Sequence, residues 1–303
     1  MGFRRRPLLC RRQGRRAIDV SIRVCARRAQ LLLLADSRVR QSWRSRVLPS
    51  QTLILTSMER SMEYEHLARG LKHALLQDPT AFHAAQLATV TKDTVASWFA
   101  PFTPPQLDER VRKVRELGAG LARYFDGWAL NVIRASNFSA VECLRLVLAH
   151  FPGFQDHTVY NGDQVFLYKR VQILVGDVWA AYGRSIVDVA DPSTHVIGGF
   201  YDIDRLTMFA DYRVPQVLRP EGVLQYSLAL DALIQAKTPI PSGNLMEVEI
   251  RACTIQAVEQ LHAVLTAKGH RIKVIELDWL LWQIGENAKD HLPNHHRTWS
   301  VFY

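Results

Sequence analysis

The chain has 303 residues, of which 48% are apolar and 22% are charged, and its formal net charge is +9. This length allows a sizeable core in one large domain or two smaller ones. The composition is typical of a globular protein and excludes collagen-like, wholly disordered and disulfide-scaffold classes. The cysteines lie far apart, so they form no CxxC metal knuckle or redox pair, and we expect a reducing compartment. They are Cys10, Cys25, Cys143 and Cys253.

The positive charge is concentrated at the amino terminus. Residues 1–50 hold 14 arginines, no lysine and two acids, which is a local charge of +12. The rest of the chain holds 24 basic and 27 acidic groups, which is a charge of −3. Because the body is slightly acidic, its charge does not favour a duplex nucleic acid as a stable partner.

The Arg-rich segment 1–58 has three interpretations. It could be an organellar transit peptide, a phosphate-binding arm for nucleic acid, or an aberrant translated sequence without selected structure. We favour the third, because its lysine-free usage differs from the body, where lysine is common. No stretch approaches the ~20 apolar residues of a membrane span. We therefore expect no membrane partner and a cytoplasmic protein, unless residues 1–58 direct it to an organelle.

Residues 59–303 have helical periodicity, and we expect them to form one domain. A helix is predicted after Ser139, whose spacing to Glu142 is that of a capping box, and it should end at the Phe151-Pro152-Gly153 break. Apolar spacing predicts further helices over 63–77, 93–99, 107–125, 163–182 and 245–268. The β-branched residues of 163–182 keep a strand alternative open. The fold class is thus mainly α, with few or no strands.

Acids and aromatic rings alternate in one segment, Phe200 to Gln216. A site that stacks a planar heterocycle and stabilises a nearby positive charge needs this combination. The alternative is a surface loop with acids as helix caps and aromatic rings in the core, and composition alone favours that alternative. The acids are Asp202, Asp204 and Asp211, and the aromatic residues are Phe200, Tyr201, Phe209 and Tyr212.

The next segment, Val214 to Ser227, has the pattern of a helix–hairpin–helix element. An apolar stretch with a proline precedes a tight turn at Gly222, and a second apolar stretch follows. Such hairpins direct backbone N–H groups at an anion. A plain corner between two helices would give the same pattern.

Two groups of charges are expected on helices. Lys169 and Arg170 lie inside the predicted helix 163–182, where they could bind phosphate or extend from a mostly buried helix to solvent. Glu247, Glu249 and Arg251 are compatible with a charge network on a helix surface.

Asp278 directly precedes the segment Trp279 to Trp282, so it lies beside large aromatic rings. Burial there would raise its pKa or require a hydrogen-bond donor. His295 and His296 are adjacent, which is no specific metal-ligand spacing. We predict no metal site and no cofactor.

Several long stretches resemble the queuosine salvage protein family, also called queuosine 5′-phosphate N-glycosylase/hydrolase. The resemblance covers about Met62 to Tyr303. The stretches that carry it are residues 151–182, 206–218, 247–262, 276–282 and 295–303, with YKRVQILVGDVW and FADYRVPQVL the most specific. The family also has an N-terminal part with an Asn-Phe-x-x-Trp-like motif and a histidine, which we do not find in residues 1–58.

The resemblance implies a helical fold similar to DNA glycosylases and hydrolysis of queuosine 5′-monophosphate to queuine and ribose 5-phosphate, for reuse of queuine in tRNA modification. An oxocarbenium-like transition state requires a carboxylate near C1′. We expect Asp211 to activate water or stabilise the cation, with Asp202 as its competitor. Asp278 is expected to bind the base or its diol. Tyr201, Phe209 or Trp282 is expected to stack on the heterocycle. The 5′-phosphate is expected to bind Lys169, Arg170 or Arg213, and we prefer Lys169.

Two alternatives stay open. The hairpin and the basic segment would also fit a DNA-glycosylase-like or nucleic-acid-binding protein. The unmatched N-terminal part would fit a family member with impaired catalysis. We expect a monomer whose partner is a small nucleotide.

Overall fold

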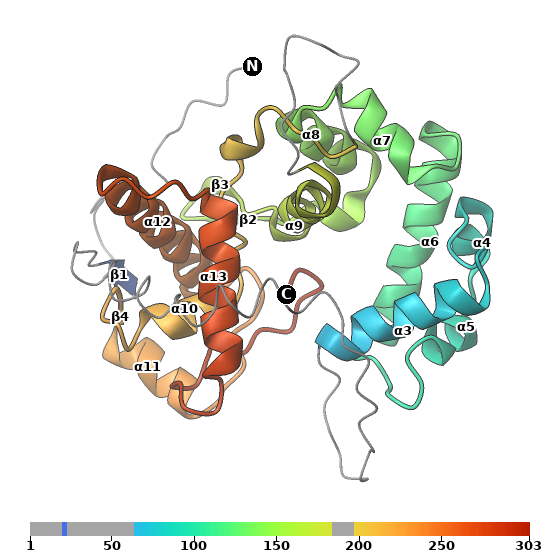
Figure 1. The fold of residues 1–303 in the computed structure, drawn as a ribbon. Coiled ribbons are helices and arrows are strands. Elements are labelled where there is room, and N and C mark those ends of the chain that lie inside the picture. The colour runs from blue at the N-terminus through green and yellow to red at the C-terminus, as the bar shows by residue number, and fades with distance from the viewer. Residues whose placement is uncertain (1–19, 23–63, 184–196) are drawn as a thin grey trace. The chain divides into compact units, whose positions relative to one another are not determined.

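The structure is a computed structural model that describes residues 20–22, 64–183 and 197–303 (Figure 1). The described residues are predominantly helical, which confirms the mainly α class. They divide into two compact units. Unit 1 contains residues 20–22, 156–180 and 202–303, and unit 2 contains residues 64–155, 181–183 and 197–201.

Unit 2 is built from helices that mostly follow local sequence signals. The hydroxyl groups of Thr91 and Ser139 begin two of them by accepting the N–H groups of Thr94 and Glu142, each at 3.1 Å. The helices are α3 (Tyr64–Gln77), α4 (Ala84–Thr89), α5 (Lys92–Ser97), α6 (Leu107–Tyr124), α7 (Ala129–Ala135), α8 (Ala140–His150) and the 3-10 helix η1 (Pro152–Phe154). The helices predicted over 63–77, 93–99 and 107–125 and after Ser139 are confirmed.

Unit 2 packs through small and apolar side chains. Gly118 of α6 lies against α4, where an added Cβ would be 2.3 Å from the Ala88 nitrogen. Val95, Phe99 and Val111 are buried in one apolar cluster of this unit. The close approach of α4 and α6 therefore requires glycine at position 118.

Unit 1 combines helices with short antiparallel strands. Its elements are β1 (Val20–Ile22), β2 (His157–Tyr160), β3 (Asp163–Phe166), α9 (Lys169–Val178), the start of the π-helix η2 (Trp179–Gly183), η4 (Ile203–Arg205), α10 (Arg213–Leu218), β4 (Leu224–Tyr226), α11 (Leu228–Gln235), α12 (Leu245–Ala267) and α13 (Val274–Asn287). The helix predicted over 245–268 is confirmed as α12.

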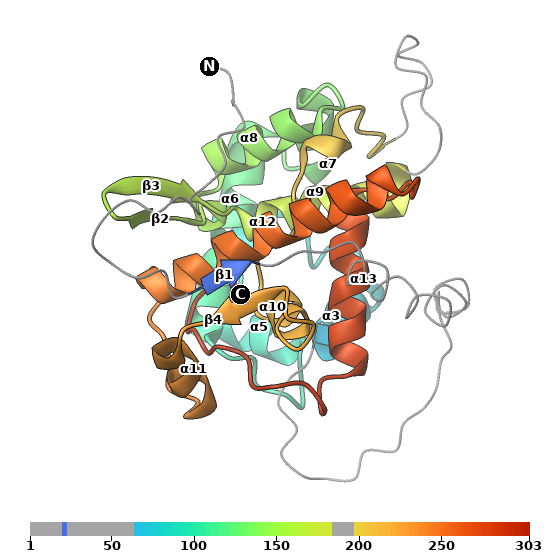
Figure 2. The ribbon, with the colours of Figure 1, turned by 90° about the vertical axis from the view of Figure 1, so that its left-hand side faces the viewer.

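The core of unit 1 lies around α12. Figure 2 shows α12 extending across the unit, with α13 and β1 beside it, and both elements contact α12. α10 packs on α13 and α12, so the segment before α10 reaches the middle of the unit. β1 pairs with β4, and Val20 is almost fully buried. The other residues of 1–58 lie outside the described residues, and the proposed boundary at residue 58 stays a prediction.

The helix predicted over 163–182 is wrong in its first part. Residues 163–166 form β3, which pairs with β2 in a hairpin. Asn161 and Gly162 make the turn with φ angles of 50° and 91°, and an Asn-Gly pair is the strongest short hairpin signal. α9 therefore begins only at Lys169, so Lys169 and Arg170 occupy its first turn and not its middle.

The segment 214–227 contains α10, a turn at Gly222 with φ of 62°, and β4, and Ser227 then caps α11. A short strand thus lies between the two helices, and the helix–hairpin–helix element stays a prediction. In the described parts of the chain, no helix has the length and apolar character needed to cross a membrane.

Candidate active site

Two buried carboxylates, Asp211 and Asp278, lie at the contact between α10 and α13. Asp211 Oδ1 accepts the N–H groups of Arg213 at 3.1 Å and Val214 at 2.9 Å, so it binds the first turn of α10. Asp278 is on α13, and its Oδ1 accepts the Phe209 N–H at 3.0 Å. Their exposed fractions are 6% and 3%. The segment 209–214 thus binds one carboxylate and supplies the other.

The two acids differ in the charges and hydrogen bonds that act on their pKa values. Burial raises the pKa of Asp211, and the charge of Lys169 and the two backbone N–H groups oppose that rise. Burial also raises the pKa of Asp278 well above its usual value, and the negative charge of Asp211 raises it further. Two acids within electrostatic reach do not both ionise readily. The pKa of Asp278 is thus raised by the neighbouring acid as well as by burial, whereas the rise of the Asp211 pKa is opposed by Lys169 and by backbone N–H groups.

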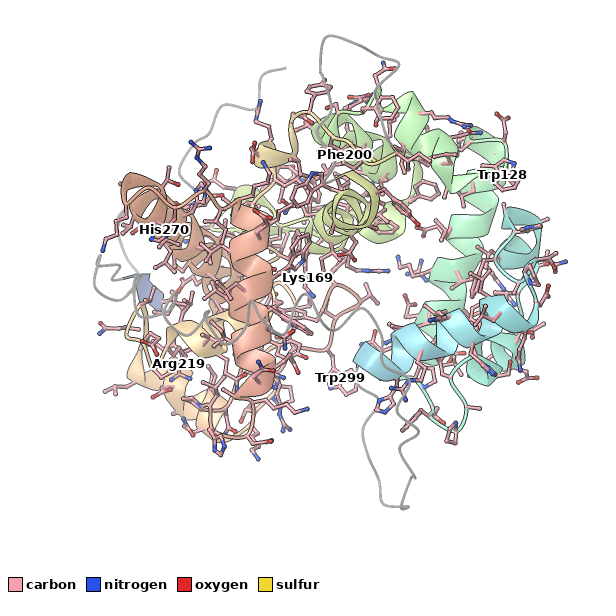
Figure 3. The ribbon with its side chains drawn as sticks, viewed as in Figure 1. Trp128, Lys169, Phe200, Arg219, His270 and Trp299 are labelled. Carbon is pink, nitrogen blue, oxygen red and sulfur yellow. The ribbon has the colours of Figure 1, made fainter. Side chains whose placement is uncertain are left out.

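Lys169 is a cation that acts electrostatically on both acids. Lys169, labelled in Figure 3, interacts electrostatically with Asp278 of α13. Burial lowers the pKa of Lys169, as does the charge of Arg251, whereas Asp211, Asp278 and Asp156 raise it. A lysine in this setting keeps its charge only through neighbouring carboxylates.

A second buried group, which we call the Arg251 network, contains Arg251, Asp156, Glu247, His296 and Tyr303. Arg251 donates to both oxygens of Asp156, at 3.0 and 2.5 Å, and to Glu247 at 3.3 Å. Asp156 Oδ2 also accepts the backbone N–H of Lys169 at 3.2 Å, so one carboxylate holds both Arg251 and the start of α9.

The expected surface network of Glu247, Glu249 and Arg251 is wrong. Their exposed fractions are 1%, 5% and 2%. Glu249 accepts the hydroxyl of Tyr160 at 2.6 Å, and Arg251 Nε donates to the Ala210 carbonyl at 3.1 Å. α12 is surrounded by other elements, and burial on both sides of a helix hides the usual amphipathic pattern.

Tyr303 and His296 complete the Arg251 network. The Tyr303 hydroxyl donates to Glu247 Oε1 at 2.7 Å and lies 3.0 Å from His296 Nε2. Burial, followed by the charge of Glu247, raises the pKa of Tyr303 well above its usual value. Burial lowers the pKa of His296 to about 3, with smaller contributions from His295 and Arg251. Both side chains are therefore neutral near pH 7.

Aromatic rings adjoin the carboxylate pair. Trp279 lies 6.3 Å from Phe209 and 6.3 Å from Trp179 between ring centroids, and the two indoles are nearly parallel. Gly176 of α9 allows this approach, because an added Cβ would be 2.9 Å from Phe209 Cζ. Trp282, one of the three residues expected to stack on the heterocycle, packs against the main hydrophobic core of unit 1.

The structure brings together four of the expected residues: Asp211, Asp278, Lys169 and Phe209. Arg213 is buried and donates to Glu286 at 2.7 Å and Gln216 at 2.6 Å, while Arg170 donates to the Val301 carbonyl at 3.3 Å. Sequence reasoning missed Asp156, Glu247, Arg251 and Tyr303 as partners in one buried network.

Two expected residues are not among these contacts. Asp202 precedes η4 and is partly buried, and the contacts described above do not include it. Tyr201 belongs to unit 2, where its N–H donates to the Phe138 carbonyl and 53% of the residue is exposed. Among the described residues, no group of three His, Cys, Asp or Glu side chains is placed to hold a metal ion.

Comparison with known proteins shows which family the chain belongs to. The sequence model of the queuosine salvage protein family matches residues 30–303. The chain belongs to this family. The match begins at residue 30. This is upstream of Met62, the position at which we expected the resemblance to begin.

Curated relatives of the queuosine salvage protein family are similar over most of their length. A protein of Dictyostelium discoideum is 46% identical over 80% of this chain and 72% of its own. One from Sphaerobacter thermophilus is 42% identical over 79% and 72%, and one from Bos taurus is 35% identical over 79% and 71%. All three are named queuosine 5′-phosphate N-glycosylase/hydrolase, so the family is one of glycosidase-type hydrolases.

Proposed function

We propose that this protein hydrolyses the N-glycosidic bond of queuosine 5′-monophosphate and releases queuine for reuse in tRNA. The observation that carries the proposal is the buried Asp211–Asp278 pair beside Lys169, in a member of this salvage family. Hydrolysis at an anomeric carbon needs one ionised carboxylate and one proton donor. The unequal environments of the two acids supply both.

In the proposed reaction, Asp211 acts at C1′. Its carboxylate stabilises the oxocarbenium-like transition state and takes a proton from the attacking water. A bond forms between the water oxygen and C1′, and the C1′–N bond breaks with its electron pair left on the base. The two backbone N–H groups that bind Asp211 Oδ1 fix the orientation of this carboxylate.

Asp278 is proposed as the group that assists departure of the base. Queuine is a 7-deazaguanine and cannot accept a proton at position 7, so protonation must occur elsewhere on the leaving base. Asp278 retains its proton because of burial and the nearby charge of Asp211. Donation of this proton and uptake of one by Asp211 balance the reaction, which yields queuine and ribose 5-phosphate.

The remaining contacts follow from the same arrangement. Phe209, which is buried, and Trp279 are the aromatic rings beside Asp278 that are proposed to contact the heterocycle. Lys169 is proposed to bind the 5′-phosphate, and its coupling to Asp211 also balances the charge of that acid. Arg170 is the second candidate for the phosphate, whereas the guanidinium of Arg213 already binds Glu286 and Gln216.

The test is incubation with queuosine 5′-monophosphate, with mass spectrometry of released queuine and ribose 5-phosphate. Asp211→Asn should lower kcat about 10³-fold and Asp278→Asn about 10²-fold, because each loses a proton-transfer group. Asp202→Asn tests the competing assignment, and it should leave kcat within about twofold of wild type if Asp211 acts at C1′.

Three outcomes would contradict parts of this proposal. Full turnover by Asp211→Asn together with a loss in Asp202→Asn would exchange their roles. Absence of queuine release by the wild-type chain would favour a member with impaired catalysis. Salt-dependent DNA binding by residues 59–303 would favour the nucleic-acid alternative.

The resemblance also implies a DNA-glycosylase-like fold with a hairpin at 214–227. The helices α10 and α11 and the positive φ of Gly222 support that part of the proposal. A monomeric state and a cytoplasmic location are proposed on the sequence alone.

A further inference from the structure

The ring of Tyr303 lies within cation–π distance of two cations of unit 1. Its ring centroid is 5.0 Å from Arg251 Cζ and 6.0 Å from Lys169 Nζ, distances at which an aromatic ring attracts a cation. Its hydroxyl is held by Glu247 and His296. We propose that Tyr303 is a positioning residue, whose ring holds Lys169 beside Asp211 and Asp278. This role rests on the proposed function.

The hydroxyl contacts fix the ring in one orientation. A tyrosine hydroxyl has one hydrogen, and Tyr303 gives it to the Glu247 carboxylate, which can only accept. His296 Nε2 must therefore carry the hydrogen of the second bond and donate it to the Tyr303 oxygen. A neutral His296 with its hydrogen on Nε2 meets this requirement, and burial keeps His296 neutral through its low pKa of about 3.

The backbone around Tyr303 is anchored separately from its hydroxyl. Gln216 donates to the Pro293 carbonyl at 2.6 Å, the Ile240 N–H donates to the Arg297 carbonyl at 2.7 Å, and Arg170 donates to the Val301 carbonyl at 3.3 Å. The ring of Tyr303 also stacks on Tyr212, with centroids 6.5 Å apart. A change at the side chain should therefore leave residues 293–302 in place.

The ring matters because burial lowers the pKa of Lys169, so each group that stabilises its positive charge counts. Lys169 faces Asp211, Asp278, Asp156 and Arg251, and only Arg251 opposes its positive charge. Arg251 is neutralised in turn by Asp156 and Glu247. If an apolar aliphatic side chain replaced the Tyr303 ring, burial would persist and the cation–π attraction would be lost. The pKa of Lys169 would then fall further.

The experiment compares Tyr303→Leu and Tyr303→Phe with a matched control, Tyr226→Leu. Tyr226 also lies under an arginine, with Arg219 Cζ 4.3 Å from its ring centroid, but on β4 and outside the Arg251 network. Each variant is assayed for kcat, KM and pH profile with queuosine 5′-monophosphate. The titration of Lys169 is followed separately by NMR with 13C at lysine Cε, assigned by the signal that Lys169→Met removes.

Tyr303→Leu should lower kcat by about tenfold to a hundredfold with KM changed less than about threefold, and should shift the alkaline limb of the pH profile and the Lys169 titration to lower pH. Tyr303→Phe keeps the ring and should recover most of both. Tyr226→Leu should lower thermal stability without moving either titration.

Two results would overturn the inference: an unchanged Lys169 titration in Tyr303→Leu, or losses in Tyr303→Leu that match Tyr226→Leu without a pH shift. If the wild-type chain releases no queuine, the proposed function fails, and the NMR titration still decides whether Tyr303 positions Lys169.

Discussion

Among the described residues, the most deeply buried ion pairs lie in unit 1 and not in unit 2. In unit 2, the ion pair of Arg145 with Glu142 has exposed side-chain fractions of 62% and 37%, and that of Arg112 with Glu109 has 58% and 42%. In unit 1, Arg251 and Asp156 are exposed by only 3% and 4%. Exposed pairs contribute little to stability, whereas buried charges carry a desolvation cost of several kcal/mol per ion.

This difference indicates where the chain uses charge for chemistry. An apolar core would be at least as stable as a buried ion pair of the same volume. Unit 1 nevertheless places Asp211, Asp278 and Lys169 next to the Arg251 network, and burial shifts the pKa of each of the three. Perturbed groups of this kind concentrate at functional sites.

Arg251→Met should be the most destabilising change. It leaves Asp156 and Glu247 buried without their cation, which costs about 3–5 kcal/mol of unfolding free energy. Urea unfolding followed by circular dichroism measures this loss. Arg112→Met removes an arginine from an exposed pair and should change stability by less than about 1 kcal/mol. Equal losses in the two variants would remove the distinction between the units.

Acid should destabilise the wild-type chain through His296. Its pKa is about 3 when folded, against 6.5 as the ordinary value, so the unfolded chain binds a proton that the folded chain excludes. Stability from this group is present above pH 6.5 and falls as pH decreases from there towards 3. The expected loss from pH 7 to pH 5 is about 2 kcal/mol, since one pKa unit corresponds to about 1.4 kcal/mol.

His296→Gln keeps an N–H donor for Tyr303 and cannot be protonated. Between pH 7 and pH 5, the unfolding free energy of this variant should therefore fall by about 2 kcal/mol less than that of the wild type. Identical pH slopes in urea unfolding would show that His296 is not held neutral in the fold.

Gly176→Ala should disturb the aromatic rings beside the carboxylates. The new methyl would lie 2.9 Å from Phe209 Cζ, and the backbone of Phe209 is fixed by its bond to Asp278. Overpacking costs about 1–3 kcal/mol, and the helix preference for alanine returns about 1 kcal/mol, so we expect a net loss of about 1 kcal/mol. Adding Phe209→Leu should relieve the clash. The double variant should thus lose less stability than the sum of the two single variants.

The helices of unit 2 could be predicted because their signals are local. Ser139 and Glu142 are three residues apart, and Val111 and Leu121 of α6 are both buried at helical spacing. The hairpin at Asn161 and Gly162 also had a local signal, but apolar spacing farther along the segment outweighed it.

The Arg251 network could not be predicted in this way. Asp156 and Arg251 are 95 residues apart, and Tyr303 is 56 residues from Glu247. Only the tertiary fold brings such residues together. From sequence alone, Glu247 and Arg251 form an (i, i+4) pair like those on helix surfaces. Asp211 and Asp278 are candidates because a site for a planar heterocycle needs acids beside aromatic rings and because the family resemblance implies a carboxylate at C1′. Their mutual coupling depends on the tertiary fold.

The smallest expected effect is the coupling between Glu142 and Arg145 on α8. Their side chains meet at 2.6 Å, three residues apart and largely in solvent. A double-mutant cycle with Glu142→Gln and Arg145→Met should give a coupling energy of about 0.3–0.5 kcal/mol, which 1 M salt should nearly abolish. The same cycle with Asp156→Asn and Arg251→Met should give a larger coupling energy that salt barely changes, because ions do not screen a pair from which water is excluded. If salt weakened the buried pair as much as the exposed pair, solvent would reach Arg251. Asp211 and Asp278 beside it would then lose the burial that raises their pKa values.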